Sequence, residues 1–301
     1  MEAWIPITLA AAFLQNLRSA LQKHLKAQLS TTGATFARFT YAGPLAALYA
    51  TGLATLGGYP VPEPNSTFAL YVLVGGLFQI FGTALLVHLF SFRNFAAGTA
   101  YSKTETVQTA IFGILILGDP LSLGAASAIL ISLAGVLTIS VARTDLSFFR
   151  LLTGWAQKPA LTGIASGACF GISAVSYRGA SLSLGGPGFL MQAAFTLACV
   201  TLLQTLVMAA WMRLREPGQI TAVVRSWRVS AWVSLAGMLA SACWFTAMTI
   251  QNAAYVRALG QVELLFTFAA GYLFFRERPN ALELIGTGLV TGGILLLLLY
   301  R

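Results

Sequence analysis

The sequence predicts an all-α membrane protein whose ten transmembrane helices form two inverted five-helix repeats. Hydrophobic residues make up 57% of the chain and charged residues only 9%, whereas soluble domains carry about 25% charged residues. The mean hydropathy of +0.78 agrees with this composition. A third observation is internal similarity, because segments of the second half match segments that lie 158 residues earlier. Most of the protein's surface is therefore expected to face lipid.

Continuous apolar runs define the expected spans. A helix needs about 20 mainly apolar residues to cross the hydrocarbon core, so a chain of this length holds about ten crossings with short connections. The expected spans are residues 4–22, 34–56, 68–91, 95–117, 121–141, 160–181, 187–212, 229–250, 253–275 and 281–300. Helix breakers fall between them, for example at 57–60, 118–120 and 185–188. The expected domains are a first repeat over 1–143, a basic linker over 144–159 and a second, inverted repeat over 160–301.

Lysine and arginine residues gather on one side of this topology. Twelve of the eighteen lie in or beside the odd-numbered connections, whereas three, Arg178, Arg257 and Arg301, lie in the even-numbered connections or at the termini. Because basic residues mark the cytoplasmic side, both termini are expected outside, in a multi-pass protein of the plasma (inner) membrane. Topology also accounts for the net charge of +9, so nucleic acid is not expected as a partner. A monomer is expected, with an oligomer left open.

Two matching segments, which begin at Asn94 and Asn252, carry the internal repeat. In this alignment Glu105 falls on Glu263, and the helix boundaries keep the same register over two spans. A repeat of five spans crosses the membrane an odd number of times, so the second copy must enter it upside down. Inverted repeats of this kind commonly build secondary transporters, with a substrate site near the midplane between the repeats.

With these features the chain resembles the EamA-type members of the drug/metabolite transporter (DMT) superfamily. The resemblance covers essentially the whole chain in span number, span length and repeat length. Its matching features are the asparagines that begin the fourth and ninth spans, and the small-residue motifs Ala134-Gly135 and Gly292-Gly293 in the spans that follow. The resemblance implies a central cavity lined by the first, third, fourth, sixth, eighth and ninth spans.

Charged residues within the fourth and ninth spans are the first candidates for a transport site. Lys103 and Glu105 follow Asn94 by nine and eleven residues, which puts them about 13 to 17 Å deep in a hydrocarbon core of about 30 Å. Glu263 has the same depth by repeat symmetry. A charge at this depth costs at least about 2.5 kcal/mol, so such residues usually face the interior of the bundle and serve function.

Further candidates lie on the same and neighbouring spans. Helical spacing places Tyr101 and Gln108 on the face of Glu105, the third span carries Gln79 and His88, and Trp244 of the eighth span is placed to stack on a substrate ring. The alternative is a structural ion pair between Lys103 and Glu263 or Glu105. A paired carboxylate keeps its charge, whereas an unpaired one in a dry cavity takes up a proton more readily and can couple transport to protons.

Enzyme signatures are missing from the sequence. It contains no HExxH, no GxSxG, no paired aspartates and no glycine-rich phosphate loop, so no catalytic residue, cofactor or metal site is expected. The three cysteines are expected to be buried apolar residues, and Gly163, Gly167 and Gly171 to allow close helix packing.

The leading prediction is therefore a secondary transporter that moves small polar metabolites by alternating access. Amino acids or related amines are the first candidates, because a cavity with both lysine and glutamate matches a zwitterion. Proton coupling is left open. A flippase for a lipid-linked or amphipathic substrate is the alternative, and a membrane-embedded enzyme is favoured less.

Overall fold

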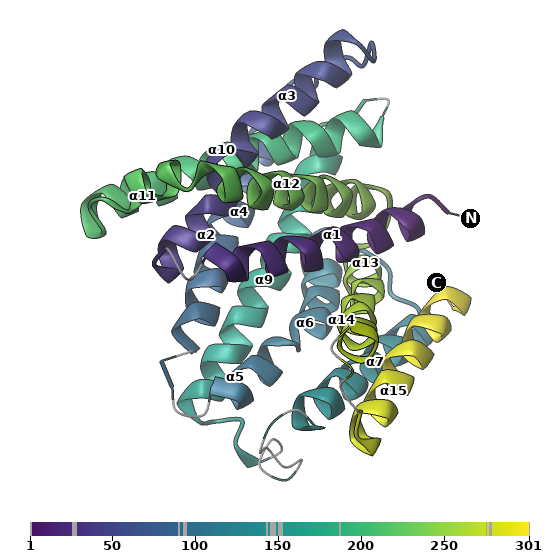
Figure 1. Cartoon of the computed structure of the whole chain (residues 1–301). Coiled ribbons are helices and arrows are strands. Elements are labelled where there is room, and N and C mark those ends of the chain that lie inside the picture. Colours follow the sequence, from purple (N-terminus) through teal and green to yellow (C-terminus); the bar gives the residue numbers. More distant parts are fainter. Residues whose placement is uncertain are drawn as a thin grey trace. The chain divides into compact units, whose positions relative to one another are not determined.

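The computed structural model describes residues 2–25, 29–89, 91–92, 95–142, 144, 149, 153–186, 188–274, 276 and 279–300. Figure 1 shows that the regular elements of these residues are helices. In chain order they are α1 (Trp4–Leu25), α2 (Thr31–Thr40), α3 (Ala42–Thr55), α4 (Ser66–Leu89), α5 (Phe95–Ser102), α6 (Glu105–Phe112), the π-helical η1 (Gly113–Leu117), α7 (Leu123–Ala142), α9 (Lys158–Ser183), α10 (Phe189–Arg215), α11 (Gln219–Arg225), α12 (Trp227–Ile250), α13 (Ala253–Gly260), α14 (Val262–Phe274) and α15 (Ala281–Leu299).

Six of the described helices are long and apolar enough to cross a membrane, namely α4, α7, α9, α10, α12 and α15. Large apolar side chains lie on the outside, for example Leu115 at 75% and Leu123 at 88% exposure. Contiguous apolar surface of this kind suits lipid rather than water. These are the features of a multi-pass integral membrane protein, whereas the number of ten spans stays a prediction.

Three of the predicted spans, 34–56, 95–117 and 253–275, each contain a break between shorter helices. Tyr41 separates α2 from α3, Lys103 and Thr104 separate α5 from α6, and Gln261 separates α13 from α14. Hydropathy is an average over a window, so it does not register a break of one or two residues. Such a break is tolerated in a membrane because polar side chains can hydrogen-bond the freed backbone groups locally.

The chain forms two compact units, and each takes segments from both halves of the sequence. The first consists of Met1–Leu77 with Ser176–Gln251, the second of Phe78–Val175 with Asn252–Arg301. These units divide the chain differently from the predicted sequence repeats, whose boundaries stay a prediction.

In the first unit α1 lies beside α12, and α3 lies beside α10 (Figure 1). Its apolar core includes Phe68 of α4, Tyr177 of α9 and Phe245 of α12. The rings of Tyr177 and Phe245 stack with their centroids 4.4 Å apart. The Tyr177 hydroxyl donates to the Gly75 carbonyl at 3.1 Å and accepts from the amide of buried Gln204 at 3.1 Å. This buried network fixes α9 against α4 and α10.

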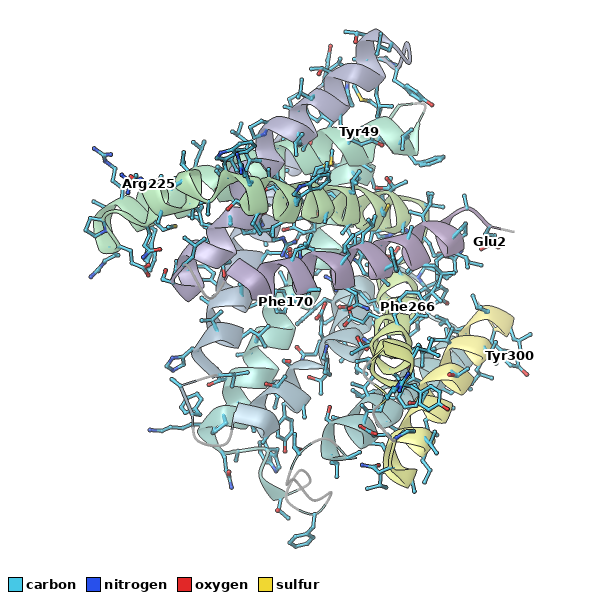
Figure 2. All side chains as sticks on the ribbon, in the orientation of Figure 1. Glu2, Tyr49, Phe170, Arg225, Phe266 and Tyr300 are labelled. Atoms are coloured by element: carbon cyan, nitrogen blue, oxygen red, sulfur yellow. The ribbon has the colours of Figure 1, made fainter. Side chains whose placement is uncertain are left out.

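In the second unit α7 and α15 run side by side, teal and yellow in Figure 1. Glycines allow their backbones to touch: a Cβ atom on Gly135 would lie 2.7 Å from the Gly286 carbonyl oxygen, and one on Gly286 2.8 Å from that of Gly135. Tyr300, labelled in Figure 2 at the end of α15, accepts a hydrogen bond on its carbonyl from the Ser122 hydroxyl at 2.6 Å. Small residues at such interfaces are what close helix packing in membranes requires.

The cysteines differ from the expectation. Cys169, Cys199 and Cys243 are free thiols in α9, α10 and α12, but each is half-buried. The expectation of buried cysteines was wrong because a helix that spans a membrane presents part of its circumference to lipid, and an apolar thiol is tolerated on either side.

Candidate functional site

The two interrupted helices of the second unit break at equivalent places in the repeat. Lys103 follows α5 and Gln261 follows α13, and the two residues are 158 positions apart. At both breaks the backbone makes short three-residue turns: Lys103 N–H donates to the Ala100 carbonyl at 3.1 Å, and Gln261 N–H to the Ala258 carbonyl at 3.2 Å. Such turns tighten a helix and end its regular course.

Hydroxyl side chains explain the break in the fourth predicted span. The Ser102 hydroxyl donates to the Thr99 carbonyl at 2.7 Å, and the Thr104 hydroxyl donates to the Tyr101 carbonyl at 2.6 Å. Side chains that bond back to the preceding turn compete with the helical ladder and bend it. The sequence Ser-Lys-Thr therefore interrupts the helix at the position that also carries the charge.

Three polar contacts join the two breaks. Lys103 Nζ lies 3.5 Å from Glu263 Oε1, and Arg257 Nε lies 3.2 Å from Glu105 Oε1. Gln261 donates its amide to the Thr106 hydroxyl at 2.9 Å. The interrupted helix α5–α6 thus supplies Lys103 and Glu105, and the interrupted helix α13–α14 supplies Arg257 and Glu263. The four charges sum to zero.

The helix termini favour this arrangement of charges. Glu105 lies in the first turn of α6 and Glu263 in the first turn of α14, whereas Arg257 lies in the last turn of α13. A carboxylate at a helix N-terminus and a cation at a C-terminus are each stabilised by about 0.3 to 1 kcal/mol. The breaks therefore create the local fields that make charges tolerable within the fourth and ninth predicted spans.

The four charged side chains keep access to their surroundings. Their exposed fractions are 33% for Lys103, 20% for Glu263, 19% for Arg257 and 22% for Glu105. Both separations exceed the 2.7 to 2.9 Å of the shortest charge-assisted hydrogen bonds. Partly exposed pairs of this length are of modest strength, about 1 kcal/mol or less each, so their ions can exchange partners.

Two amide groups at the breaks have acceptor capacity left. The carbonyl oxygens of Gln108 and Gln261 are buried and receive no hydrogen bond from the described residues. The Gln108 amide nitrogen donates to the Thr104 hydroxyl at 2.8 Å and to the Ile164 carbonyl at 3.3 Å, which sets the orientation of the amide. Buried acceptors are normally satisfied, so each of these two carbonyl oxygens can accept a hydrogen bond from a bound group.

The other face of α5 and α6 packs on the glycines of α9. A Cβ atom on Gly167 would lie 2.9 Å from the Ser102 carbonyl oxygen, and one on Gly171 3.2 Å from the Thr109 amide nitrogen. Gly163 similarly faces the Gly98 carbonyl. The expectation of close packing at these three glycines is confirmed.

The remaining predicted site residues have separate environments. Tyr101 packs beside the small apolar cluster of Ala100 and Val141. Gln79 accepts a hydrogen bond from the Ser173 hydroxyl at 3.0 Å. His88 is exposed near the end of α4, where its ring meets Phe92 edge-on at 5.1 Å.

Trp244 belongs to the first unit, where its indole N–H donates to the Gln15 side-chain oxygen at 3.1 Å. Asn94, the other sequence landmark, lies outside the described residues. Asn252 caps α13, because its side chain accepts the Ala254 N–H at 2.8 Å.

Two arginines were misplaced by the sequence analysis. Arg257 was assigned to a connection but lies within α13, and Arg178 lies within α9. Arg178 Nη1 donates to the carbonyls of Met248 at 2.7 Å and Gln251 at 2.9 Å, at the end of α12. Both stand near helix ends, where residue counting does not separate helix from connection. Glu105 could have indicated a role for Arg257, because a carboxylate within a membrane span requires a nearby cation.

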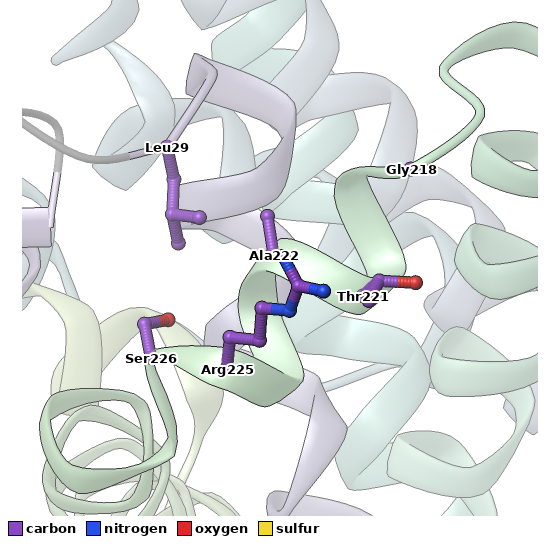
Figure 3. A pocket seen from close by; sticks show the side chains of 6 residues that line it. All are labelled: Leu29, Gly218, Thr221, Ala222, Arg225 and Ser226. Carbon is purple, nitrogen blue, oxygen red and sulfur yellow. The ribbon is translucent and has the colours of Figure 1, made fainter.

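An open cavity of about 500 Å³ lies in the first unit beside α11. Figure 3 shows Leu29 reaching toward the gap between Ser226 and Ala222, with the Arg225 side chain below it. In Figure 2 Arg225 stands at the end of α11. Apart from Leu29, the cavity is lined by residues between the seventh and eighth predicted spans, and none of the predicted site residues lines it.

Comparisons with known proteins complete the evidence. The model of the EamA-like transporter family matches the chain twice, over residues 3–141 and 157–299. A solved structure described as "Crystal structure of protein" is 18% identical, with a TM-score of 0.72 over 100% of this chain and 98% of that chain, and so shares the fold. A search of curated proteins finds no match. The two family matches together span nearly the whole chain and show a two-repeat architecture. The chain therefore belongs to the EamA-like transporter family, within the DMT superfamily.

Proposed function

We propose that this DMT-type membrane transporter moves small polar metabolites, with amino acids and related amines as first candidates, through the paired helix breaks of α5–α6 and α13–α14. The observation that carries the proposal is that ion pairs join the two breaks, Lys103 with Glu263 and Arg257 with Glu105. Broken helices within membranes line substrate and ion sites because their free backbone groups and terminal dipoles can hold charged groups.

The hydrogen-bond inventory favours a substrate with an ammonium group. Glu105 and Glu263 offer four carboxylate oxygens, and the buried carbonyls of Gln108 and Gln261 add two acceptors. A primary ammonium has three N–H donors and no acceptor. It can displace Lys103 or Arg257 from a carboxylate and donate to a glutamine carbonyl at the same time. The carboxylate of an amino acid can then pair with the displaced cation, so that the charges still balance.

Transport follows if the ion pairs open and close with the state of the protein. A solute that binds one facing state better than the other shifts the equilibrium between them. We propose that the two repeats are inverted, that ten spans cross the plasma (inner) membrane with both termini outside, and that the repeats rock about the site. Tyr101, Gln79, His88 and Trp244 are proposed to contact the solute along its path. Membership of a transporter family favours this function over an embedded enzyme.

The test is uptake of labelled amino acids, amines, nucleosides and sugar phosphates into proteoliposomes under an imposed pH gradient. Glu105→Gln and Glu263→Gln are expected to lower the flux at least tenfold, since a hydrogen bond to a charged group is worth about 1.5 to 3 kcal/mol. If protons are coupled, the variants also lose the dependence on the gradient. Glu283→Gln is the matched control, because Glu283 lies at the start of α15, where glutamine also serves in the capping box.

Unchanged flux in both glutamate variants would show that the pairs are structural. If no solute crosses the membrane but a fluorescent phospholipid is translocated, the protein is a flippase and the proposal for soluble metabolites is wrong.

A further inference from the structure

The short helix α11 connects two helices that are long and apolar enough to cross a membrane, α10 and α12. The connection covers residues 216–226, and α11 itself has seven residues. Seven helical residues extend about 10 Å, which is too short to cross a hydrocarbon core of about 30 Å. We therefore expect α11 at the membrane surface where α10 ends and α12 begins, at the level of the lipid headgroups.

Contacts with the start of α2 hold the cavity beside α11 in shape. The hydroxyl of Ser30, the N-cap of α2, donates to the Glu216 carboxylate at 2.8 Å, and the Ser30 N–H donates to the Gln219 side-chain oxygen at 3.4 Å. A Cβ atom on Gly33 would lie 2.7 Å from the same Gln219 oxygen. Leu29, which lines the cavity, is buried. The walls of the cavity are therefore packed parts of the fold.

The segment that carries this cavity is strongly basic. Its charged residues over 189–251 are one carboxylate, Glu216, and four exposed arginines, Arg213, Arg215, Arg225 and Arg228. Among the described residues none of these four arginines forms an ion pair, and the Glu216 carboxylate accepts the Ser30 hydroxyl. The positive charge of the segment therefore exceeds its negative charge, and an anionic partner would balance it.

Two side chains supply hydrogen-bond donors to the cavity. Arg225 and Thr221 lie one helical turn apart and line it from the same face of α11 (Figure 3). The guanidinium offers five N–H donors in a planar fork that matches two oxygens of a phosphate, and the threonine hydroxyl adds another donor. The volume of about 500 Å³ lies within the range of about 300 to 1,000 Å³ that is usual for ligand sites. The lining therefore fits a phosphate group.

Exposed apolar side chains beside the cavity favour a phospholipid over a soluble phosphate. Val224 and Trp227, within two residues of Arg225, are 51% and 56% exposed, and Leu29 adds an apolar side chain to the lining. Tryptophan is enriched at the headgroup level of membranes because its ring has an apolar body and a polar N–H. A lipid with its phosphate on Arg225 can place its acyl chains on this apolar surface, whereas a free phosphate gains nothing from it.

We propose that the cavity beside α11 binds the phosphodiester of an anionic phospholipid, with the phosphate on Arg225 and Thr221 and the acyl chains beside Trp227. Basic pockets at the ends of membrane helices bind anionic headgroups in this way. The positive-inside pattern accounts for arginines in this segment, but it does not require a cavity with a guanidinium in its lining. The proposal does not depend on which solute the protein transports, or on transport at all.

The test is native mass spectrometry of the purified full chain in detergent, with dioleoyl phosphatidylglycerol or dioleoyl phosphatidylcholine added at about 0.15 M salt. The two lipids share the phosphodiester and the acyl chains and differ in net charge. The first phosphatidylglycerol is expected to bind at least about fivefold more tightly than the first phosphatidylcholine. Arg225→Gln is expected to weaken phosphatidylglycerol binding at least about tenfold, because the charge and the two parallel bonds are lost together. Arg225→Lys keeps the charge and recovers only part of the affinity.

Two further variants separate the cavity from the charge of the whole segment. Arg213→Gln removes an exposed arginine that does not line the cavity. It is expected to change the affinity less than about twofold, because salt screens exposed charges beyond about 8 Å. Ala222→Leu keeps every charge but fills the cavity, and it is expected to abolish the preference for phosphatidylglycerol. The comparison of the two lipids on the unmodified protein requires no variant to fold.

Equal affinity of the unmodified protein for the two lipids overturns the proposal, as does unchanged binding in Arg225→Gln. If Arg213→Gln weakens binding as much as Arg225→Gln, the charge of the segment attracts the lipid and the proposal of a site is wrong. Inorganic phosphate at the concentration of the lipid is not expected to displace it; if it does, the cavity takes a free phosphate and the proposal is also wrong. Losses in Arg225→Gln and Ala222→Leu with Arg213→Gln unaffected support the site.

Discussion

Replacing Gly167 with alanine adds one methyl group where α9 meets the break between α5 and α6. The new Cβ atom would lie 2.9 Å from the Ser102 carbonyl oxygen and 3.2 Å from the Glu105 amide nitrogen, whereas ordinary contacts are 3.4–4 Å. Both neighbours are backbone atoms, which cannot swing aside as the end of a side chain can. Overpacking of this kind costs about 1 to 3 kcal/mol, and relief requires α9 and the break to separate.

Thermal unfolding in detergent, followed with a thiol-reactive dye, measures this cost because the three free cysteines become accessible on unfolding. A loss of about 1 to 3 kcal/mol lowers Tm by about 2 to 10 °C in a protein of this size. Solute flux falls as well, since Lys103 and Glu105 flank the displaced turn. Gly288→Ala is the matched control: nothing lies within 4 Å of its Cβ position, so stability is unchanged or rises by up to about 1 kcal/mol. If Gly167→Ala melts with or above the control, α9 does not contact the break and the reasoning is refuted.

Three other substitutions probe polar contacts by the same melting assay. Arg257→Gln removes the cation 3.2 Å from Glu105 and is expected to lower stability by up to about 1 kcal/mol, with partial recovery when Glu105→Gln is added. A double-mutant cycle without coupling contradicts the ion pair. Arg178→Gln removes the donors to the carbonyls that end α12 and costs about 1.5 to 3 kcal/mol, whereas exposed Arg228→Gln stays within about 0.5 kcal/mol. Tyr177→Phe leaves a buried carbonyl without its donor and costs about 1 to 3 kcal/mol; an unaltered Tm rules out that network.

Much of the site was accessible from local sequence. The repeat register predicted the same depth for Glu105 and Glu263, and the helical rise per residue put Lys103 close to that level. The charges of the fourth and ninth spans were therefore selected by position alone. The pairing of Lys103 with Glu263 was one of two pairings left open, and the structure selects it. Arg257 was missed as a site residue. It lies only four residues after the start of the ninth predicted span, and it was therefore counted with the connection before that span.

Composition and hydropathy by themselves determined the membrane setting and the helical class, since both follow from the average character of long segments. The family was a resemblance carried by the internal repeat and its motifs, and the family model shows it. The tertiary structure alone decided where the helices break and which cation faces Glu105. Breaks depend on side chains that satisfy a few backbone groups, and the contacts join residues far apart in the chain. Their energies depend on distances of a few ångströms between helices, and hydropathy and periodicity carry no information on such distances.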